Sequence, residues 1–350
     1  MIAVTFADLV FRARQFLIAV IGVALVLAMA LLLSGLSHGF TFELEQTVNG
    51  FGATNWVLAS GAHGRLTSVA TFPQSDVTAI RVQPGVSQAQ PLLILPSQST
   101  EINGEAVSVN LAGVVPGALG SPAVSAGNGH GLAGPLQVVV DTRLKAPIGS
   151  TITVGGRPLN VVGTVSDRTL LGGVPMVYLP LSTAQKIALV GQPLVTAVLV
   201  IGSPSHVHSG LDVLTPQMVV TASVGQLKAA VSSITNSTVL MWIIAAFIVA
   251  ALLYVAALER RSDFAVLKAL GASSAQLFGS LVIEAVIITL IAAAIAELVS
   301  NEMTFLFQQP VVIQTSSYIQ LPLIAIVVGL LASVVALRRA TGADPAAAFG

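Results

Sequence analysis

Four long apolar stretches, separated by segments of ordinary polarity, dominate the pattern of hydrophobic and polar positions along the chain. Each holds about 20 residues, the length that a helix needs to cross the ~30 Å hydrocarbon core of a bilayer. Three stretches contain no charged residue, and the third in chain order contains Glu284 and, at its end, Glu297. The pattern predicts four transmembrane helices, at 16–36, 239–258, 277–298 and 319–337.

The segment 37–238, between the first two predicted spans, has the polarity of a folded domain. Short runs rich in Val and Ile, bounded by Gly and Pro, predict strands. One helix is expected to begin near Ser75 and end before Pro84, and another to begin near Ser182, the expected N-cap. The Gly-, Pro- and Ser-rich tract 116–135 predicts a long loop. We therefore expect an α+β domain with strands at 107–115, 136–140, 151–154, 159–165, 176–179, 195–201 and 218–221.

The N-terminal segment allows two interpretations. Arg12 and Arg14, which precede the first apolar stretch, would also suit a cleaved signal peptide. The stretch has 21 residues, however, against ~7–15 in a signal peptide, and no Ala-x-Ala site follows it, so a retained span is favoured. Within 1–15, Ile2 and Phe6 share one helical face, which predicts an amphipathic cytoplasmic helix at the membrane surface.

The composition agrees with a membrane protein. The chain is 54% hydrophobic and 9% charged, whereas soluble domains are about 25% charged. It contains no cysteine, which excludes disulfides and thiolate metal sites. Its net charge of zero provides no basic field for nucleic acid.

Basic residues near the span ends predict the orientation of the chain in the membrane. They fall in three clusters: Arg12 and Arg14; Arg260, Arg261 and Lys268; and Arg338 and Arg339. The short loop 299–318 contains no Lys or Arg. Because basic residues accumulate on the cytoplasmic side, we expect both termini, the connector 259–276 and the tail 338–350 to be cytoplasmic. The domain at 37–238 and the loop at 299–318 are then extracytoplasmic.

The connector between the second and third predicted spans concentrates charge in a chain that has little. Phe264, Leu267 and Leu270 recur at helical spacing, and Gly271 can end the helix. The pattern predicts a short amphipathic helix. Two interpretations stay open from the pattern alone: the helix rests on lipid headgroups, or it is a docking surface for a cytoplasmic partner.

The residues of this connector, "ERRSDFAVLKALGAS", and of the next span, "LVIEAVIITLI", resemble the signature of the FtsX/MacB-like permeases. These are the membrane subunits of type VII ABC transporters. The matching positions are Glu259, Arg260, Asp263, Val266, Lys268, Leu270, Gly271, Ala272 and Ser273, then Glu284 and Ala285, and, in the C-terminal "ADPAAAF", Asp344, Pro345 and Ala348. Two segments of the large domain, "IGSTITVGGRPLNVVGTV" and "VYLPLSTAQKI", resemble the MacB-like periplasmic core less specifically.

The sequence departs from the family pattern at a few positions. Ala292, Ala293 and Ala296 stand where relatives usually carry Gly, which keeps close helix packing but should stiffen the helix. Phe264 replaces the usual Ile on the apolar face of the connector. Glu284, about ten residues into a span, is an intramembrane functional candidate, with a purely structural role as the alternative.

The resemblance implies a permease subunit in a bacterial cell (inner) membrane that is not itself an enzyme and binds no cofactor. The sequence contains no P-loop, so ATP and Mg²⁺ would be held by a separate cytoplasmic ATPase, in two copies on a permease homodimer. Expected partners also include membrane lipid and an extracytoplasmic protein, but no nucleic acid. The expected ATPase contact is Glu259, Arg260, Asp263, Phe264, Leu267, Lys268, Leu270 and Gly271.

The implied mechanism is mechanotransmission. ATP hydrolysis moves the connector, the spans tilt, and the extracytoplasmic domain changes shape to export or extract a substrate. Two alternatives stay open: a regulator of a cell-wall hydrolase, like FtsX itself, and an importer of a small polar solute.

Other candidate sites have less support. His206 and His208 form a His-x-His pair that could hold Zn²⁺, but Pro204 interrupts the strand and no third ligand is near in sequence, so we expect no metal. Asp141 and Asp167 have no nucleophile or base beside them, so we expect no hydrolase site.

Overall fold

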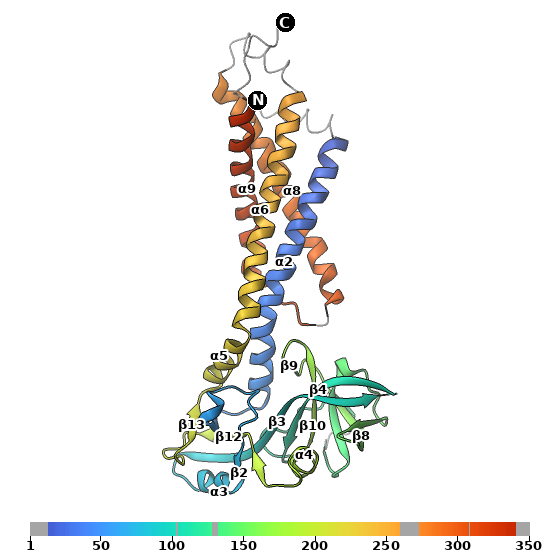
Figure 1. Ribbon diagram of the computed structural model, residues 1–350, viewed down its shortest axis with the longest axis vertical. Coiled ribbons are helices and arrows are strands. Elements are labelled where there is room, and N and C mark those ends of the chain that lie inside the picture. The colour runs from blue at the N-terminus through green and yellow to red at the C-terminus, as the bar shows by residue number, and fades with distance from the viewer. Residues whose placement is uncertain (1–12, 103, 128–131, 260–272, 308, 341–350) are drawn as a thin grey trace. The chain divides into compact units, whose positions relative to one another are not determined.

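The computed structural model describes residues 13–102, 104–127, 132–259, 273–307 and 309–340 (Figure 1). The chain divides into two compact units. The membrane unit consists of Met1–His38 and Ala230–Gly350, and the sheet domain consists of Gly39–Ala229.

Four helices make up the described part of the membrane unit. They are α2 (Ala13–Gly50), α6 (Lys228–Glu259), α8 (Ser274–Met303), which a short 3-10 turn η3 (Thr304–Leu306) follows, and α9 (Thr315–Ala340). The residues of α2 from Gly39 onward belong to the sheet domain. Each helix contributes to one buried apolar core, for example Leu27, Val249, Ile288 and Ala325. The opposite faces expose large apolar side chains such as Phe247 and Leu323, as expected of helices that face lipid.

Small side chains allow α8 and α9 to pack closely. A Cβ atom added at Gly329 of α9 would lie 3.1 Å from Thr289 Oγ1 and 3.2 Å from the Ala285 carbonyl oxygen of α8. Ala292, Ala293 and Ala296 are buried in the same core. Membrane helices commonly use small residues to bring their backbones together. The three alanines are buried in the shared core, and the expectation that they preserve close packing stays a prediction.

Three of the four predicted spans correspond to helices long and apolar enough to cross a membrane. Within the described residues these are Val20–Gly50, Lys228–Leu252 and Val282–Leu306. The fourth prediction, 319–337, falls on α9, of which the shorter stretch Thr315–Leu331 is apolar. The fourth span therefore stays a prediction.

The sheet domain is built on a mixed sheet of eleven strands, with a separate two-stranded sheet beside it. The main path runs β13-β1-β12-β3-β4-β10-β6-β8-β5, and β7 and β9 pair off it. Most pairs are antiparallel, but β4–β10 and β6–β8 are parallel. In chain order the elements are β1 (Asn55–Ala59), η1 (Ser60–Ala62), β2 (Phe72–Pro73), α3 (Ser75–Arg81), β3 (Val86–Ile102), β4 (Glu105–Val114), β5 (Ala126–Gly127), β6 (Gln137–Asp141), η2 (Thr142–Leu144), β7 (Thr151–Val154), β8 (Arg157–Val165), β9 (Thr169–Leu170), β10 (Val174–Pro180), α4 (Leu181–Ala188), β11 (Leu194–Val195), β12 (Ala197–Gly202), β13 (Leu211–Leu214) and α5 (Pro216–Gln226).

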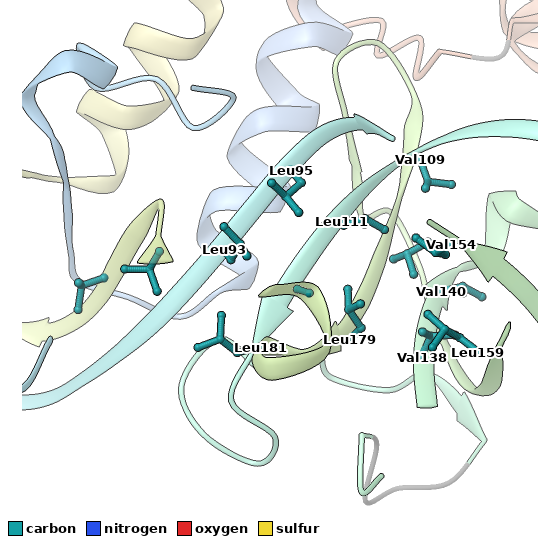
Figure 2. Packing of buried hydrophobic residues seen from close by; sticks show 14 of the residues in the cluster. Leu93, Leu95, Val109, Leu111, Val138, Val140, Val154, Leu159, Leu179 and Leu181 are labelled. Carbon is teal, nitrogen blue, oxygen red and sulfur yellow. The ribbon is translucent and has the colours of Figure 1, made fainter. Parts of the chain in front are cut away.

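Alternating side chains of the central strands feed two separate cores. Successive residues of a strand point to opposite faces, so Leu93 and Leu95 of β3 pack with α3 and α4 (Figure 2). Leu92 and Ile94 pack on the other face with α5 and with the end of α2. The expected class was α+β. The domain has helices on both faces of a mixed sheet in which most strand pairs are antiparallel and two are parallel.

Local structure differs from the sequence prediction in a few places. Six of the seven expected strands overlap β4, β6, β7, β8, β10 and β12. The seventh, 218–221, is wrong because it lies in helix α5, where the Thr215 side chain accepts a hydrogen bond from Met218 N and Pro216 occupies the first turn. Helix α4 begins at Leu181, after Pro180, and no side chain caps it, so the predicted cap at Ser182 is also wrong.

Candidate functional site

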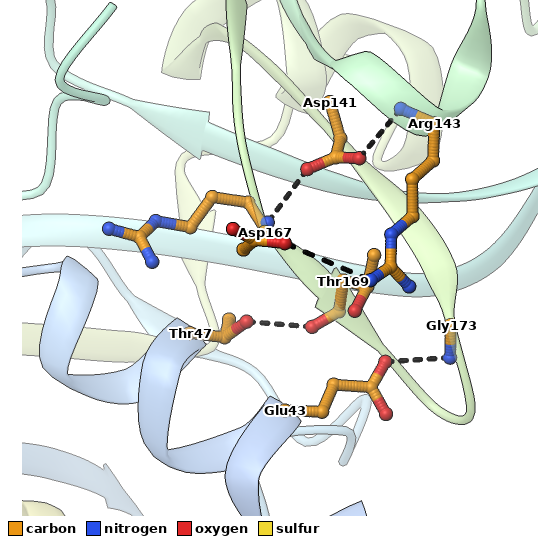
Figure 3. Close-up of polar contacts among 8 residues, drawn as sticks. Glu43, Thr47, Asp141, Arg143, Asp167, Thr169 and Gly173 are labelled. Carbon is orange, nitrogen blue, oxygen red and sulfur yellow. Dashed lines mark hydrogen bonds and ion pairs between the residues drawn. The ribbon is translucent and has the colours of Figure 1, made fainter. Parts of the chain in front are cut away.

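Two buried polar side chains stand one helical turn apart near the C-terminal end of α2. Glu43 is 3% exposed and Thr47 is 0% exposed. Residues four apart share a helix face, and within the sheet domain this face meets the turn between β9 and β10 (Figure 3). Burying a carboxylate is costly unless hydrogen bonds compensate for lost water. The hydrogen-bond partners of Glu43 therefore show how this end of the helix is held in the domain.

The turn between β9 and β10 presents two successive backbone N–H groups to Glu43. Gly173 N donates to Oε1 at 2.7 Å, and Gly172 N donates to Oε2 at 3.0 Å. Leu171, Gly172 and Gly173 have φ angles of 62°, 82° and 88°, in the left-handed region that glycine adopts readily. Successive N–H groups in such a turn form a concavity that binds anions. The carboxylate is thus held through both of its oxygens.

Two further hydrogen bonds join the helix end to β9 and the residue before it. Thr47 Oγ1 donates to the Thr169 carbonyl oxygen at 2.6 Å. Arg168 Nη1 donates to the Gln46 carbonyl oxygen at 2.9 Å. The C-terminal end of a helix carries partial negative charge, so a guanidinium is favourable there. Gly50 makes room for it, since a Cβ atom at that position would lie 2.5 Å from Arg168 Cζ.

Asp141, at the end of β6, holds the residues before β9 in place. Its Oδ2 accepts from Arg168 N at 2.7 Å, and its Oδ1 accepts from Arg143 N at 2.9 Å. Burial raises the pKa of the Asp141 carboxyl, and these two N–H groups and the Arg143 guanidinium partly oppose that rise. Arg143 Nη2 also lies 3.8 Å from Asp167 Oδ1, a more exposed ion pair.

These contacts attach the end of α2 to the sheet, and none of them pairs a nucleophile with a base. The helix end is fixed to the sheet by side chain–backbone hydrogen bonds that all form within Gly39–Ala229. Because the buried groups are charged or directly hydrogen-bonded, they specify one position of the helix on the sheet. We call this set of residues the helix anchor: Glu43, Gln46, Thr47, Arg168, Thr169, Gly172 and Gly173.

Most of the residues predicted to contact an ATPase fall outside the described part of the chain. Glu259 is the last residue of α6 and is exposed. The others, Arg260, Asp263, Phe264, Leu267, Lys268, Leu270 and Gly271, are not among the described residues, and the C-terminal motif residues Asp344 and Pro345 are not either. Their roles stay predictions.

Glu284 lies in α8 and is 1% exposed. It directly precedes Ala285, whose backbone meets Gly329 of α9 at the close helix contact. The residue predicted from the sequence as an intramembrane candidate is therefore a buried one. Its role in transport stays a prediction.

The structure brings His206 and His208 to one hollow of about 260 Å³, together with Asp76 of α3. Gln83 holds this loop in place by accepting from His206 N at 3.0 Å and donating to the His206 carbonyl oxygen. Among the residues that the structure describes, no group of three or more His, Asp or Glu side chains is arranged to hold a metal ion.

The helix anchor has no local signature that the sequence alone reveals. Glu43 and its partners are about 130 positions apart in the chain, so no local pattern links them. One signal was present: an acid and a threonine four residues apart just beyond a predicted span, and a Gly-Gly pair between two short apolar runs.

Comparison with known proteins assigns the chain to a family. Residues 16–236 match the family model of the MacB-like periplasmic core domain, and residues 237–345 match that of the FtsX-like permease C-terminal region. The chain therefore belongs to the FtsX/MacB-like ABC transporter permeases.

Curated proteins with similar sequences are also ABC transporter permeases. The ABC transporter permease Rv2563 of Mycobacterium tuberculosis H37Rv is 37% identical over 343 residues, which cover 98% of this chain and 97% of the relative. The permease Rv0072 of the same strain is 36% identical with the same coverage. The crystal structure of the periplasmic region of MacB from Actinobacillus actinomycetemcomitans aligns with 50% of this chain and 95% of that chain, at 17% identity and a TM-score of 0.36.

Proposed function

We propose that this permease couples ATP hydrolysis by a separate cytoplasmic ATPase to a change in shape of the sheet domain. The helix anchor is the observation that carries this proposal. Helix α2 runs without a break from Ala13 to Gly50, and its last turns are bonded to β9 and to the turn before β10. A continuous helix transmits displacement along its axis because each residue is hydrogen-bonded to the next turn. Movement of the α2 span would then reach the sheet through Glu43 and Thr47.

The proposed arrangement in the membrane follows from the basic clusters of the sequence. Both termini and the connector 259–276 are cytoplasmic, and the sheet domain is extracytoplasmic, by the positive-inside rule. Helix α9 is the fourth span. The permease is a homodimer, and each copy contacts one ATPase through the connector, with Phe264 as a buried anchor and Glu259 at the rim.

The spans support transmission of force better than a solute channel. A path for a polar solute needs polar side chains around a shared cavity. Apart from Glu284, and from Glu297 at the end of the same span, the predicted spans contain only scattered hydroxyls, Trp242 and Gln320. We therefore propose that the cargo is exported or extracted by the sheet domain or from the outer leaflet, without crossing the helical bundle in water.

A distance measurement between the two copies of the dimer tests the proposal. The chain contains no cysteine, so Gln88→Cys, at an exposed position on β3, accepts one nitroxide label per subunit. The labelled permease is reconstituted with its ATPase, and the distance distribution is measured without nucleotide and after ATP turnover in the presence of vanadate, which traps the ATPase with ADP. We expect the distribution to shift in the trapped state and to stay fixed when ATP is added with an ATPase variant that cannot bind ATP. An identical distribution in all states would contradict coupling to the sheet domain.

A further inference from the structure

A cavity of about 270 Å³ lies among α2, α6 and α9, entirely within the membrane unit. It is large enough for part of an amphipathic molecule and too small for a folded protein or a long peptide. The cavity shares no residue with the helix anchor, so the proposed coupling does not account for it.

The lining changes from polar to apolar in the same direction on all three helices. Its polar end includes His38 of α2, Thr238 of α6 and Ser317 of α9. Its apolar end includes Leu31, Trp242 and Ile324, one or two turns away on the same helices. The polar residues lie one or two positions outside the predicted spans 16–36, 239–258 and 319–337. The polar end of the cavity therefore corresponds to the predicted membrane–water boundary, where an amphiphile places its headgroup.

Three of the polar side chains in the lining already donate a hydrogen bond within their own helix. His38 Nδ1 donates to the Ser34 carbonyl oxygen at 2.9 Å, which leaves Nε2 of the neutral ring as an acceptor. Thr238 Oγ1 donates to the Ile234 carbonyl oxygen at 3.0 Å, and Thr235 Oγ1 donates to the Val231 carbonyl oxygen at 2.9 Å. Each hydroxyl has thus used its proton within its own helix and keeps lone pairs for a ligand. The other polar residues of the lining, Ser34, Ser37, Ser317 and Gln320, can both donate and accept. A ligand hydroxyl, which also does both, therefore matches the lining.

The absence of charged side chains from the cavity lining favours an uncharged ligand. Its lining contains no Asp, Glu, Lys or Arg, so a charged headgroup would find no counter-charge there. We propose that the cavity binds an uncharged, hydroxyl-bearing acylglycerol from the outer leaflet. The glycerol hydroxyls donate to His38 and Thr238, and the acyl chain follows the wall formed by Leu31, Trp242 and Ile324. This proposal does not depend on the proposed coupling to an ATPase.

Photo-labelling of the purified full-length permease, in detergent and without nucleotide, tests the proposal. The probe is a monoacylglycerol with a diazirine in its acyl chain, and labelled peptides are located by mass spectrometry. We expect labels within 30–38, 235–242 and 317–324, and competition by unlabelled monoacylglycerol. Two matched probes separate the chemistry: a fatty acid methyl ester, which lacks the hydroxyls, and a phosphatidic acid, which is anionic. Both should label these segments more weakly than the monoacylglycerol.

A pair of substitutions provides the internal control. Thr238→Val removes one acceptor and should weaken half-maximal labelling roughly fivefold, the effect of one hydrogen bond, while Thr238→Ser should restore it. Thr289→Val is the control, because Thr289 Oγ1 makes the same kind of bond, to the Ala285 carbonyl oxygen at 2.9 Å, outside the cavity. If Thr238→Val does not fold, Ser37→Phe fills the cavity and should block labelling. Equal labelling by the methyl ester, preference for phosphatidic acid, or labelling that neither Thr238→Val nor Ser37→Phe reduces would overturn the proposal.

Discussion

Replacing Glu43 by alanine removes the carboxylate at the centre of the helix anchor. The substitution leaves α2 intact, because alanine has the highest helix propensity. It removes the acceptor of two backbone hydrogen bonds, from Gly173 N at 2.7 Å and from Gly172 N at 3.0 Å. The change is therefore confined to the joint between the helix and the β9–β10 turn.

The size of the effect follows from the two N–H groups left without an acceptor. A buried donor without a partner costs about 1–3 kcal/mol, so two such donors cost about 2–6 kcal/mol. Removal of the buried carboxylate also removes its desolvation penalty, which opposes folding, so the net cost is smaller than this sum. We expect the turn to open more easily by about 2–4 kcal/mol, which corresponds to a change of roughly 30- to 1,000-fold in its opening equilibrium.

Hydrogen–deuterium exchange measures this opening directly. Peptides that contain Gly172 and Gly173 should exchange roughly 30- to 1,000-fold faster in Glu43→Ala. Glu43→Gln keeps one carbonyl acceptor but places an amide donor against the second N–H group, so its effect should be smaller. Glu45→Ala, the same substitution two residues further along the helix, should leave the turn unchanged because Glu45 makes no hydrogen bond to it.

Unchanged exchange at Gly172 and Gly173 in Glu43→Ala would refute this reasoning. So would an equal acceleration in Glu45→Ala, since the effect would then come from general loosening of α2. Acceleration spread evenly over the sheet domain would indicate global destabilisation and would also contradict a local anchor.

Other predictions concern topology, docking and pH. A reporter fused at Gly131 should behave as extracytoplasmic and one fused at Gly350 as cytoplasmic; the opposite pattern would reject the proposed orientation. Glu259→Lys should weaken co-purification of the ATPase because it reverses a charge at the rim of the proposed contact. Phe264→Ala should weaken binding of the ATPase by about 2 kcal/mol, as expected for a buried anchor. If both variants bind and stimulate the ATPase fully, the connector is only a helix on the lipid surface. Burial raises the pKa of Asp141 above its ordinary 3.8, so its contribution to stability is fully present below pH 3.8 and is lost as the pH rises through the folded-state value. Thermal unfolding followed by tryptophan fluorescence should therefore show a pH-dependent loss over this range that is smaller in Asp141→Asn. A pH profile that Asp141→Asn leaves unchanged would contradict the assignment.

Elements with a regular local pattern could be predicted from the sequence. The apolar helices follow from length and composition, and β4, β6, β7, β8 and β10 follow from Val- and Ile-rich runs between Gly and Pro. Strand β3 was missed because Pro91 and Pro96 argue against a strand of 17 residues. The structure accommodates Pro96 beside a register shift between Leu95 and Gln98, where Asn110 Oδ1 accepts from Ser97 N at 3.1 Å.

The error at 218–221 has a local cause. Val219 and Val220 are β-branched and therefore favour a strand, but the preceding Thr-Pro pair is a helix start signal. Thr215 caps α5 and Pro216 opens it, and these signals outweigh a short apolar run. The helix anchor could not be predicted in this way, because it forms only when β9 and β10 are brought to the end of α2 by the fold.

The ATP-driven distance change in a Glu43→Ala background tests the central claim most directly. The nitroxide at Gln88→Cys and the reconstituted ATPase are used as above, and ATP hydrolysis is measured on the same sample. Transmission through the helix anchor predicts that Glu43→Ala loses the shift in distance while ATP hydrolysis continues, and that Glu45→Ala keeps both. A wild-type shift in Glu43→Ala, with its turn shown to be open by hydrogen exchange, would contradict the claim that the anchor carries movement to the sheet domain.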